Sequence, residues 1–182
     1  MRELASKSQL RMSFLRWALF CVSLILLLGI GSGVISNSGY QNSWFAGLIK
    51  PAEMPPGAVF GIVWTSLYVL LGLAIAMIVG ARGAPGRGWA ITLFCVQMLL
   101  NFAWSPLFFA LHEITSAFYL LLAILLLALV TTLLFARIRR VAALLMVPYV
   151  LWLAFASYLA FEIDRLNPDG GRVVMPSVST QI

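Results

Sequence analysis

Residues 117–136, AFYLLLAILLLALVTTLLFA, decide the fold class of this chain. The stretch has no charged residue, and an α-helix of about 20 residues rises about 30 Å, the thickness of the hydrocarbon core of a bilayer. Its leucine runs, 120–122 and 125–127, make it the clearest lipid-facing helix in the sequence. The stretch therefore predicts a membrane-spanning helix, for which we expect the bounds 114–137.

The rest of the sequence is almost as apolar. Of its 182 residues, 62% are apolar and 10% are charged, and the mean hydropathy is +1.00. A water-soluble protein of this size could not bury so much apolar surface, so lipid must be the solvent for most of it. We expect five spans, at 14–36, 56–81, 88–110, 114–137 and 141–163. The fold class is therefore all-α integral membrane, a five-transmembrane-helix bundle over 14–164, with a basic N-terminal extension at 1–13 and a flexible tail at 165–182.

The segments between the expected spans contain residues that begin and end helices. Pro55 and Pro56 suit the first turn of a helix, where the N–H that proline lacks would have no partner. Residues 82–87, RGAPGR, are typical of a tight exposed turn. The first apolar stretch has an alternative interpretation as a signal peptide, because a basic start precedes it and small residues follow it. Its length, greater than a usual signal core, favours a span.

The basic residues are unequally divided between the two sides of the predicted bundle. One side carries Arg2, Lys7, Arg11, Arg16, Arg82, Arg87, Arg137, Arg139 and Arg140, and the other carries Lys50, Arg165 and Arg172. This division predicts a multi-pass membrane protein with a cytoplasmic N-terminus. The net charge of +6 has no compact soluble domain to carry it, so the sequence does not indicate nucleic-acid binding.

The sequence offers few groups for ion transport or acid–base catalysis. The middles of all five expected spans lack Asp, Glu, Lys, Arg and His, which ion-coupled pumps and channels use at membrane depth. His112 has no neighbouring partner in the sequence that would make it a base. Cys21 and Cys95 have no metal-ligand spacing and are interpreted as small buried apolar residues. We therefore predict no metal site.

Neutral polar and aromatic residues recur on single helix faces. Gln97, Asn101 and Trp104 are spaced four and three residues apart, so they share one face of the third span. Trp64 and Tyr68 repeat this spacing in the second span. The fifth span has a similar face, formed by Tyr149, Trp152 and Phe155. Hydrogen bonding between helices and aromatic packing are the alternatives to ligand contact. Together these faces predict a mostly apolar cavity suited to a flat hydrophobic ligand.

Ordered motifs across four spans support a more specific interpretation. They are 44–48 (WFAGL) with Lys50-Pro51, Pro55-Pro56, Val63-Trp64 with Leu67-Tyr68, Gln97 with Asn101, Trp104 with Pro106 and Phe108-Phe109, and Pro148-Tyr149 with Trp152 and Ala154-Phe155. In these motifs residues 44–167 resemble the TspO/MBR family of tryptophan-rich sensory proteins and translocator proteins, also called the peripheral benzodiazepine receptor family.

The resemblance implies a five-helix membrane bundle, usually a homodimer, with a pocket under the first loop. It further implies binding of porphyrins such as protoporphyrin IX and haem, in some members of cholesterol or synthetic ligands, and a link to tetrapyrrole regulation or stress. Light-dependent porphyrin degradation would involve Trp64 and Trp152. The expected ligand-binding residues are Trp44, Lys50, Trp64, Tyr68, Asn101, Trp104, Tyr149 and Trp152. In that set Lys50 could pair with a propionate at the pocket mouth.

Three departures from the family pattern bear on this interpretation. Residues 52–54 are Ala-Glu-Met where the family usually has a tryptophan, which puts the porphyrin-binding role of this loop in question. Ala160 stands where an asparagine is common. The sterol-recognition pattern fails because six residues separate Tyr158 from Arg165, so specific cholesterol binding is not predicted.

The leading hypothesis is a bacterial membrane receptor or translocator for tetrapyrroles, with the porphyrin or haem as ligand and no resident cofactor. Its expected partners are a hydrophobic small molecule, membrane lipid and a second copy of the chain. Two alternatives stay open at this stage. The first is an enzyme that degrades porphyrin in the light, and the second is a structural or signalling subunit whose pocket holds only lipid.

Overall fold

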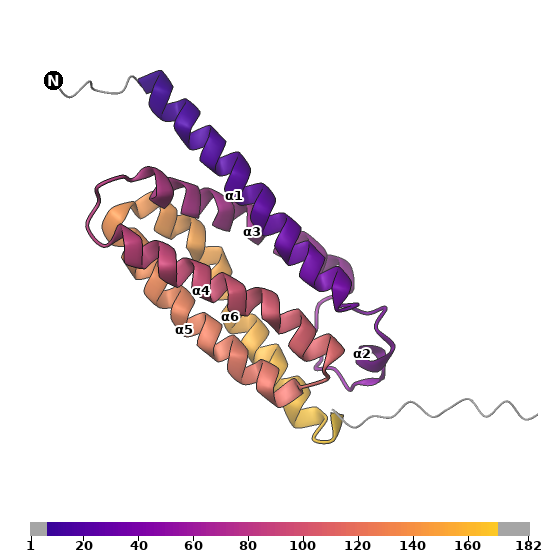
Figure 1. The fold of residues 1–182 in the computed structure, drawn as a ribbon. Helices are drawn as coiled ribbons and strands as arrows, with labels where there is room; N and C mark the ends of the chain where they lie inside the picture. The colour runs from indigo at the N-terminus through magenta and orange to yellow at the C-terminus, as the bar shows by residue number, and fades with distance from the viewer. Residues whose placement is uncertain (1–6, 171–182) are drawn as a thin grey trace, which may run out of the picture.

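The computed structural model describes residues 7–170 (Figure 1). Five of its helices are long and apolar enough to cross a membrane, which confirms the predicted fold class. The elements in chain order are α1 (Lys7–Ile35), α2 (Ser43–Gly47), α3 (Gly57–Gly80), α4 (Arg87–Ser105), the π-helix η1 (Pro106–Ala110), α5 (Ile114–Ile138) and α6 (Arg140–Leu166).

Two domain boundaries differ from the prediction. The first helix begins at Lys7, so the second half of the predicted basic extension is part of α1. The helix α6 continues to Leu166, and the segment up to Gly170 makes hydrogen bonds with the first loop. The predicted flexible tail therefore begins too early, because a tail that binds the loop is ordered at its start. Residues 171–182 lie outside the described part of the chain.

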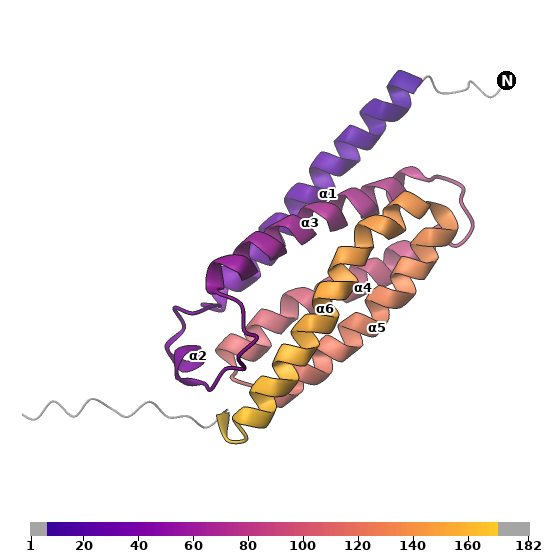
Figure 2. The same ribbon diagram turned by 180° about the vertical axis from the view of Figure 1, so that it is seen from behind.

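The five long helices form a bundle in which α1 packs on α3, α3 on α6, α6 on α5 and α5 on α4 (Figures 1 and 2). The helices α5 and α6 are separated by Arg139 alone and form one of the main interfaces, and α1 and α3 form another. The N-terminal turns of α1 extend beyond the other helices in both views. The backbones of α1 and α3 come close at Gly72, where an added Cβ would lie 2.6 Å from the Cα of Val22.

At two helix ends, side chains donate hydrogen bonds to backbone carbonyls that have no helical partner. Pro106 lacks the N–H that would bond to the carbonyl of Phe102, and Ser32 of α1 donates its hydroxyl to that carbonyl at 2.5 Å instead. At the end of α3, Arg87 donates to the carbonyls of Ile78 and Val79 at 3.0 and 2.7 Å. The predicted turn after α3 is confirmed, and Gly83 and Gly86 adopt positive φ there.

The loop between α1 and α3 covers one end of the bundle. The short helix α2 lies in this loop, and the ends of α1, α4 and α6 and the start of α5 surround it in both views (Figures 1 and 2). Trp44 and Phe45 of α2 pack against Phe108 and Phe109 of η1 in a small core of their own. This core attaches the loop to the bundle above the cavity described next.

Candidate ligand-binding cavity

A cavity of about 730 Å³ lies under the first loop. Its volume falls within the range of about 300–1,000 Å³ that small-molecule sites occupy. Residues of all five long helices contribute to its wall, together with the loop and η1. The wall consists of Gly29, Ile30, Gly33, Val34, Asn37, Ser38, Gly39, Tyr40, Gln41, Phe45, Met54, Gly57, Phe60, Gly61, Trp64, Thr65, Tyr68, Asn101, Trp104, Ser105, Phe108, Phe109, Leu121, Trp152, Ala156, Leu159, Ala160 and Ile163.

The π-helix η1 positions the aromatic floor of the cavity. Leu111 donates its N–H to the carbonyl of Pro106 five residues earlier, at 3.0 Å, which widens the last turn after α4. In this turn Phe108 stacks on Trp104, with ring centroids 5.0 Å apart and planes at 12°. The indole N–H of Trp104 donates to the carbonyl of Ala117 on α5 at 3.1 Å. The ring of Trp104 is therefore fixed in place before any ligand binds.

A chain of hydrogen bonds links three helices at the cavity wall. Tyr68 of α3 donates its hydroxyl to Oδ1 of Asn101 on α4 at 3.4 Å, and Nδ2 of Asn101 donates to the hydroxyl of Tyr149 on α6 at 3.2 Å. Tyr149 is fully buried, and Asn101 is 6% exposed. The predicted inward orientation of Asn101 is thus confirmed. Its amide joins α3 to α6 as well as lining the cavity.

Two tryptophans line the cavity from the neighbouring helices α3 and α6. Trp64 of α3 packs against Tyr68 with ring centroids 5.4 Å apart, and Trp152 of α6 packs edge-on against Phe60 at 5.6 Å. The indole nitrogen of Trp152 is buried and has no hydrogen-bond partner within residues 7–170. A buried N–H of this kind costs free energy, because it has left water without gaining an acceptor.

The loop above the cavity is held by its own polar contacts. Asn42 caps α2 by accepting the N–H of Phe45 at 3.0 Å, and its Nδ2 donates to the carbonyl of Phe109 at 3.3 Å. Tyr40 donates its hydroxyl to the carbonyl of Pro55 at 2.7 Å. Since Tyr40 and Phe45 also line the cavity, these bonds fix two parts of its roof.

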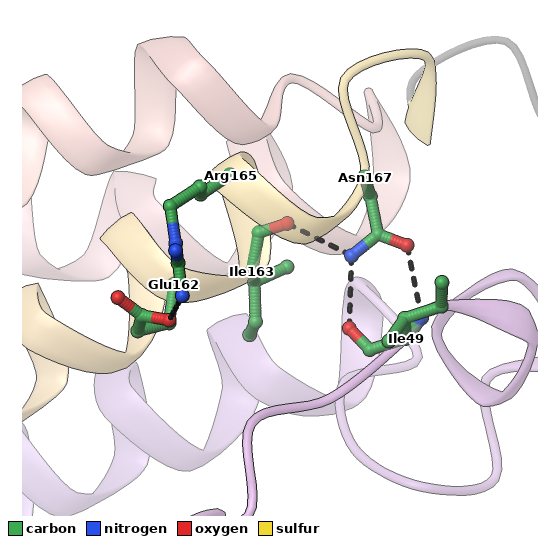
Figure 3. Close-up of polar contacts among 5 residues, drawn as sticks. All are labelled: Ile49, Glu162, Ile163, Arg165 and Asn167. Atoms are coloured by element: carbon green, nitrogen blue, oxygen red, sulfur yellow. Dashed lines mark hydrogen bonds and ion pairs between the residues drawn. The ribbon is translucent and has the colours of Figure 1, made fainter.

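The segment after α6 clamps the same loop (Figure 3). The side chain of Asn167 accepts the N–H of Ile49 at 2.9 Å and donates to the carbonyl of Ile49 at 2.8 Å, as a paired strand would. Trp44 donates its indole N–H to the carbonyl of Gly170 at 2.8 Å. The first loop is thereby tied to residues more than a hundred positions away in the chain.

Lys50 is occupied by the loop. Its ammonium donates to the carbonyls of Phe45, Leu48 and Ala46 at 2.7, 3.0 and 3.3 Å, and it lies 4.7 Å from the ring centroid of Phe45. Burial lowers the pKa of this ammonium below its usual value. Lys50 does not line the cavity, and its three donors serve the end of α2.

The structure brings together most, but not all, of the residues expected to bind ligand. Trp64, Tyr68, Asn101, Trp104 and Trp152 line the cavity, whereas Trp44, Lys50 and Tyr149 lie behind its wall. The residues that α1 contributes to the cavity wall were not predicted. One of them is Gly29, where any side chain would overlap the ring of Tyr68. A row of glycines in an apolar span is the sequence signal that could have indicated a helix lying close to a cavity.

Several other predicted residues have structural positions outside the cavity. His112 stacks on Trp44 with ring centroids 4.2 Å apart, and no group of His, Cys, Asp and Glu suited to a metal occurs within the described residues. Cys21 is buried, but Cys95 is exposed, which contradicts its interpretation as a buried residue. Gln97 is fully buried as predicted, and in the described part of the chain its amide has no hydrogen-bond partner.

A five-span helical bundle with an aromatic cavity under its first loop defines a class of small polytopic membrane proteins with a ligand-sized internal site. Residues 21–166 match the TspO/MBR family, and the chain belongs to this family. The match extends the resemblance found in the motifs towards the N-terminus, into α1.

Curated relatives cover most of the chain. The tryptophan-rich protein TspO of Chlorobaculum tepidum is 34% identical over 156 residues, which are 81% of this chain and 94% of the relative. The translocator protein of Homo sapiens is 33% identical over 147 residues, 79% of this chain and 86% of the relative. Protein CrtK of Rhodobacter capsulatus is 32% identical over 138 residues, 75% of this chain and 84% of the relative.

Proposed function

We propose that this protein is a membrane receptor or translocator for tetrapyrroles such as protoporphyrin IX, and for related flat hydrophobic molecules. The observation that carries this proposal is the cavity of about 730 Å³ with aromatic rings on several walls. Flat conjugated ligands gain from apolar burial and from stacking on such rings. The homodimer implied by the family resemblance, contact with membrane lipid and a bacterial membrane belong to the same proposal.

The cavity suits the flat ring of a porphyrin with or without its metal. No histidine or cysteine is among its lining residues in the described part of the chain, whereas Met54, Tyr40 and Tyr68 are of types that can also ligate haem iron. A metal-free porphyrin needs only the stacking surfaces and neutral hydrogen-bonding groups that the wall supplies. Protoporphyrin IX is therefore the appropriate first ligand for a test.

The test is a titration of detergent-solubilised protein with protoporphyrin IX in the dark, followed by tryptophan fluorescence. We expect saturable quenching at micromolar ligand in the wild type and weaker affinity in the Trp64→Phe, Trp152→Phe double variant. Trp89→Phe is the matched control, because Trp89 is 72% exposed on α4 and does not line the cavity. Linear quenching that is equal in all proteins would contradict the proposal and leave a lipid-filled pocket as the better hypothesis.

A light-dependent enzyme is the second candidate, and the placement of two indoles in one cavity favours it. Trp64 and Trp152 both line the space in which a porphyrin would lie, so either could donate an electron to a photoexcited ring. We expect porphyrin absorbance to fall with time under illumination in air, and the loss to stop when both Trp64 and Trp152 are replaced by Phe. Equal loss in the wild type and the double variant would assign the photochemistry to the porphyrin alone.

A further inference from the structure

The two ends of the bundle carry opposite charge. Within the described residues every acid lies at the cavity end, namely Glu53, Glu113, Glu162, Asp164 and Asp169. At the other end, the turn after α3 and the junction of α5 and α6 lie together in both views (Figures 1 and 2). The charged residues described at that end are all basic, namely Lys7, Arg11, Arg16, Arg82, Arg87, Arg137, Arg139 and Arg140. This end, called the arginine end below, therefore attracts anions.

Most of the arginines at this end are not used by the protein itself. Within residues 7–170, five of them are exposed and have guanidinium groups with no ion pair or hydrogen bond, namely Arg11, Arg82, Arg137, Arg139 and Arg140. Arg87 differs, because its guanidinium donates to carbonyls at the end of α3. Both basic residues of the cavity end are also engaged, one by loop carbonyls and one by a carboxylate (Figure 3). The free cations are thus concentrated at the arginine end.

Three of these free arginines lie at the junction of α5 and α6. Arg137 is in the last turn of α5, Arg139 alone connects the two helices, and Arg140 begins α6. Consecutive Cα atoms are 3.8 Å apart, so the Cα atoms of Arg137 and Arg140 are separated by at most about 11 Å. Guanidinium groups pair with phosphate oxygens in a bidentate manner, and three of them this close together can share one phosphate.

Exposed apolar side chains continue from the junction along both helices. Leu133 on α5 and Val141 and Leu144 on α6 are all exposed. Because the arginines end two spans, they lie at the depth of the lipid phosphates, and the leucines lie at the depth of the acyl chains. Trp89, exposed at the start of α4, is of a type that is enriched at this depth. A partner that contacts both surfaces needs an anionic group joined to hydrocarbon chains.

We propose that the junction of α5 and α6 binds an anionic phospholipid, with the phosphate held by Arg137, Arg139 and Arg140 and the acyl chains along the exposed apolar residues of the two helices. Clusters of basic residues beside a span recognise anionic headgroups in this way. A zwitterionic headgroup also carries a cation, which the arginines repel, so phosphatidylglycerol is preferred to phosphatidylcholine. The inference goes beyond the proposed function and does not depend on it, because the cavity lies at the opposite end.

Native mass spectrometry of the detergent-solubilised full chain measures the dissociation constant of the first bound lipid. The comparison is between phosphatidylglycerol and phosphatidylcholine with the same acyl chains. We expect the wild type to bind phosphatidylglycerol at least about tenfold more tightly. In the variant with Arg137→Gln, Arg139→Gln and Arg140→Gln, we expect this preference to fall to about twofold or less. Equal binding of the two lipids by the wild type would overturn the inference.

A second triple variant separates a defined site from diffuse charge. It carries Arg11→Gln, Arg16→Gln and Arg82→Gln, which remove the same charge from the same end and leave the junction intact. We expect it to keep the preference for phosphatidylglycerol. An equal loss of preference in the two triple variants would overturn the inference, because the net charge of this end would then be sufficient.

Two further measurements address folding and the source of the phosphate. Arg139→Gln alone changes only the residue between the helices, and we expect it to lower the preference about threefold. No change in this variant would contradict a role for the junction even if the triple variant failed to fold. Millimolar inorganic phosphate is expected not to displace phosphatidylglycerol. Displacement would identify a site for soluble anions and would overturn the assignment to a lipid.

Discussion

Asn101 shows how a single amide can serve both the fold and the site. It lies on the aromatic and amide face predicted for the third span, and it bonds to Tyr68 and Tyr149 on two other helices. An amide in a membrane interior needs such partners, because no water is present to replace them. The hydrogen bonds also orient Asn101 at the cavity wall, so its side chain is rigid before a ligand arrives.

Removing the hydroxyl of Tyr149 tests this network. In Tyr149→Phe the Nδ2 of Asn101 loses its acceptor, and we expect the free energy of unfolding to fall by about 1 kcal/mol, since such bonds in membranes are worth about 0.6 and at most about 1.7 kcal/mol. Denaturant titration in detergent measures the change. Tyr119→Phe is the control, because Tyr119 is 63% exposed on α5 and is expected to have no effect. An equal loss in both variants would contradict the role of the network.

At the residue scale, the sequence predicts which face of a helix a side chain occupies. It does not predict whether that side chain lines the cavity or lies behind its wall. The spacing of Trp64, Tyr68 and Trp152 placed them correctly at the cavity. Tyr149 shares the predicted face of Trp152, yet it is fully buried, and it contacts the cavity-lining residues Asn101 and Trp64 without lining the cavity itself. The three donors of Lys50 are used locally, and this depends on the exact course of the loop, which periodicity does not describe.

Helix contacts depend on a few places where two backbones come very close. Gly72 of α3 is such a place, because an added Cβ would lie 2.6 Å from both Cα and Cγ2 of Val22 and 2.8 Å from its backbone N. A backbone atom cannot move aside as a flexible side chain can. The packing of α1 on the bundle therefore depends on a glycine at this position.

Gly72→Ala is expected to lower the free energy of unfolding by about 1–3 kcal/mol, the usual cost of overpacking. Gly61→Ala in the same helix is the matched control. Nothing lies within 4 Å of the Cβ that it would add, so the better helix propensity of alanine is expected to leave stability unchanged or raise it by up to about 1 kcal/mol. Denaturant titration of the two variants side by side distinguishes the outcomes. A Gly72→Ala variant more stable than the wild type would contradict this prediction, because it would show that α1 can shift to make room for the added methyl group.

The contact between the end of α6 and the first loop is a second link between elements. Asn167→Ala removes both hydrogen bonds to Ile49 and the bond from Nδ2 to the carbonyl of Ile163 at 2.8 Å. We expect amide exchange at Ile49 to become faster by tenfold or more, because its N–H loses its acceptor. Hydrogen–deuterium exchange with mass spectrometry measures this at the loop peptide.

Arg165→Gln is the control for this prediction. It removes the exposed ion pair with Glu162 one turn away, which is expected to contribute little and to leave loop exchange unchanged. Unchanged exchange in Asn167→Ala, or equal acceleration in Arg165→Gln, would mean that other contacts hold the loop. The indole bond of Trp44 to Gly170 would then be the next candidate.

At the element scale, local signals in the sequence predicted the long helices well. Apolar length, Pro55-Pro56 and the 82–87 turn gave helix ends close to those observed. The short helix α2 and the π-helix η1 were not predicted, because both depend on tertiary contacts: α2 packs on η1, and the missing donor of Pro106 is compensated by Ser32 from another helix. The ordered start of the C-terminal segment at Asn167 was not predicted either, because it also depends on tertiary contacts, here with the first loop.

Most of the basic residues lie at the end of the molecule opposite to the cavity, and Lys50 and Arg165 lie at the cavity end. Arg82 and Arg87 lie at the turn after α3, and Arg137, Arg139 and Arg140 lie at the junction of α5 and α6. The first loop and the cavity beneath it lie at the other end in both views (Figures 1 and 2). Because basic residues favour the cytoplasmic side, the cavity is expected to face away from the cytoplasm.

Cysteine labelling tests this orientation. In a background with Cys21→Ala and Cys95→Ala, Ser43→Cys places a thiol on the exposed loop helix, and Gly88→Cys places one at the arginine-rich end, where nothing lies within 4 Å of an added Cβ. With the protein in the inner membrane of a bacterial host, a membrane-impermeant maleimide applied to spheroplasts is expected to label Ser43→Cys. The same reagent is expected to label Gly88→Cys only after lysis.

Total labelling after detergent solubilisation shows that both thiols are reactive, and unchanged thermal unfolding shows that the cysteine-free background is folded. If Gly88→Cys were labelled in intact spheroplasts and Ser43→Cys only after lysis, the cavity would face the cytoplasm. A hydrophobic ligand would then enter the cavity from the cytoplasm, which is the opposite of what the distribution of basic residues indicates. The expected pattern instead places the cavity where ligands arrive from outside the cytoplasm or laterally from the outer leaflet.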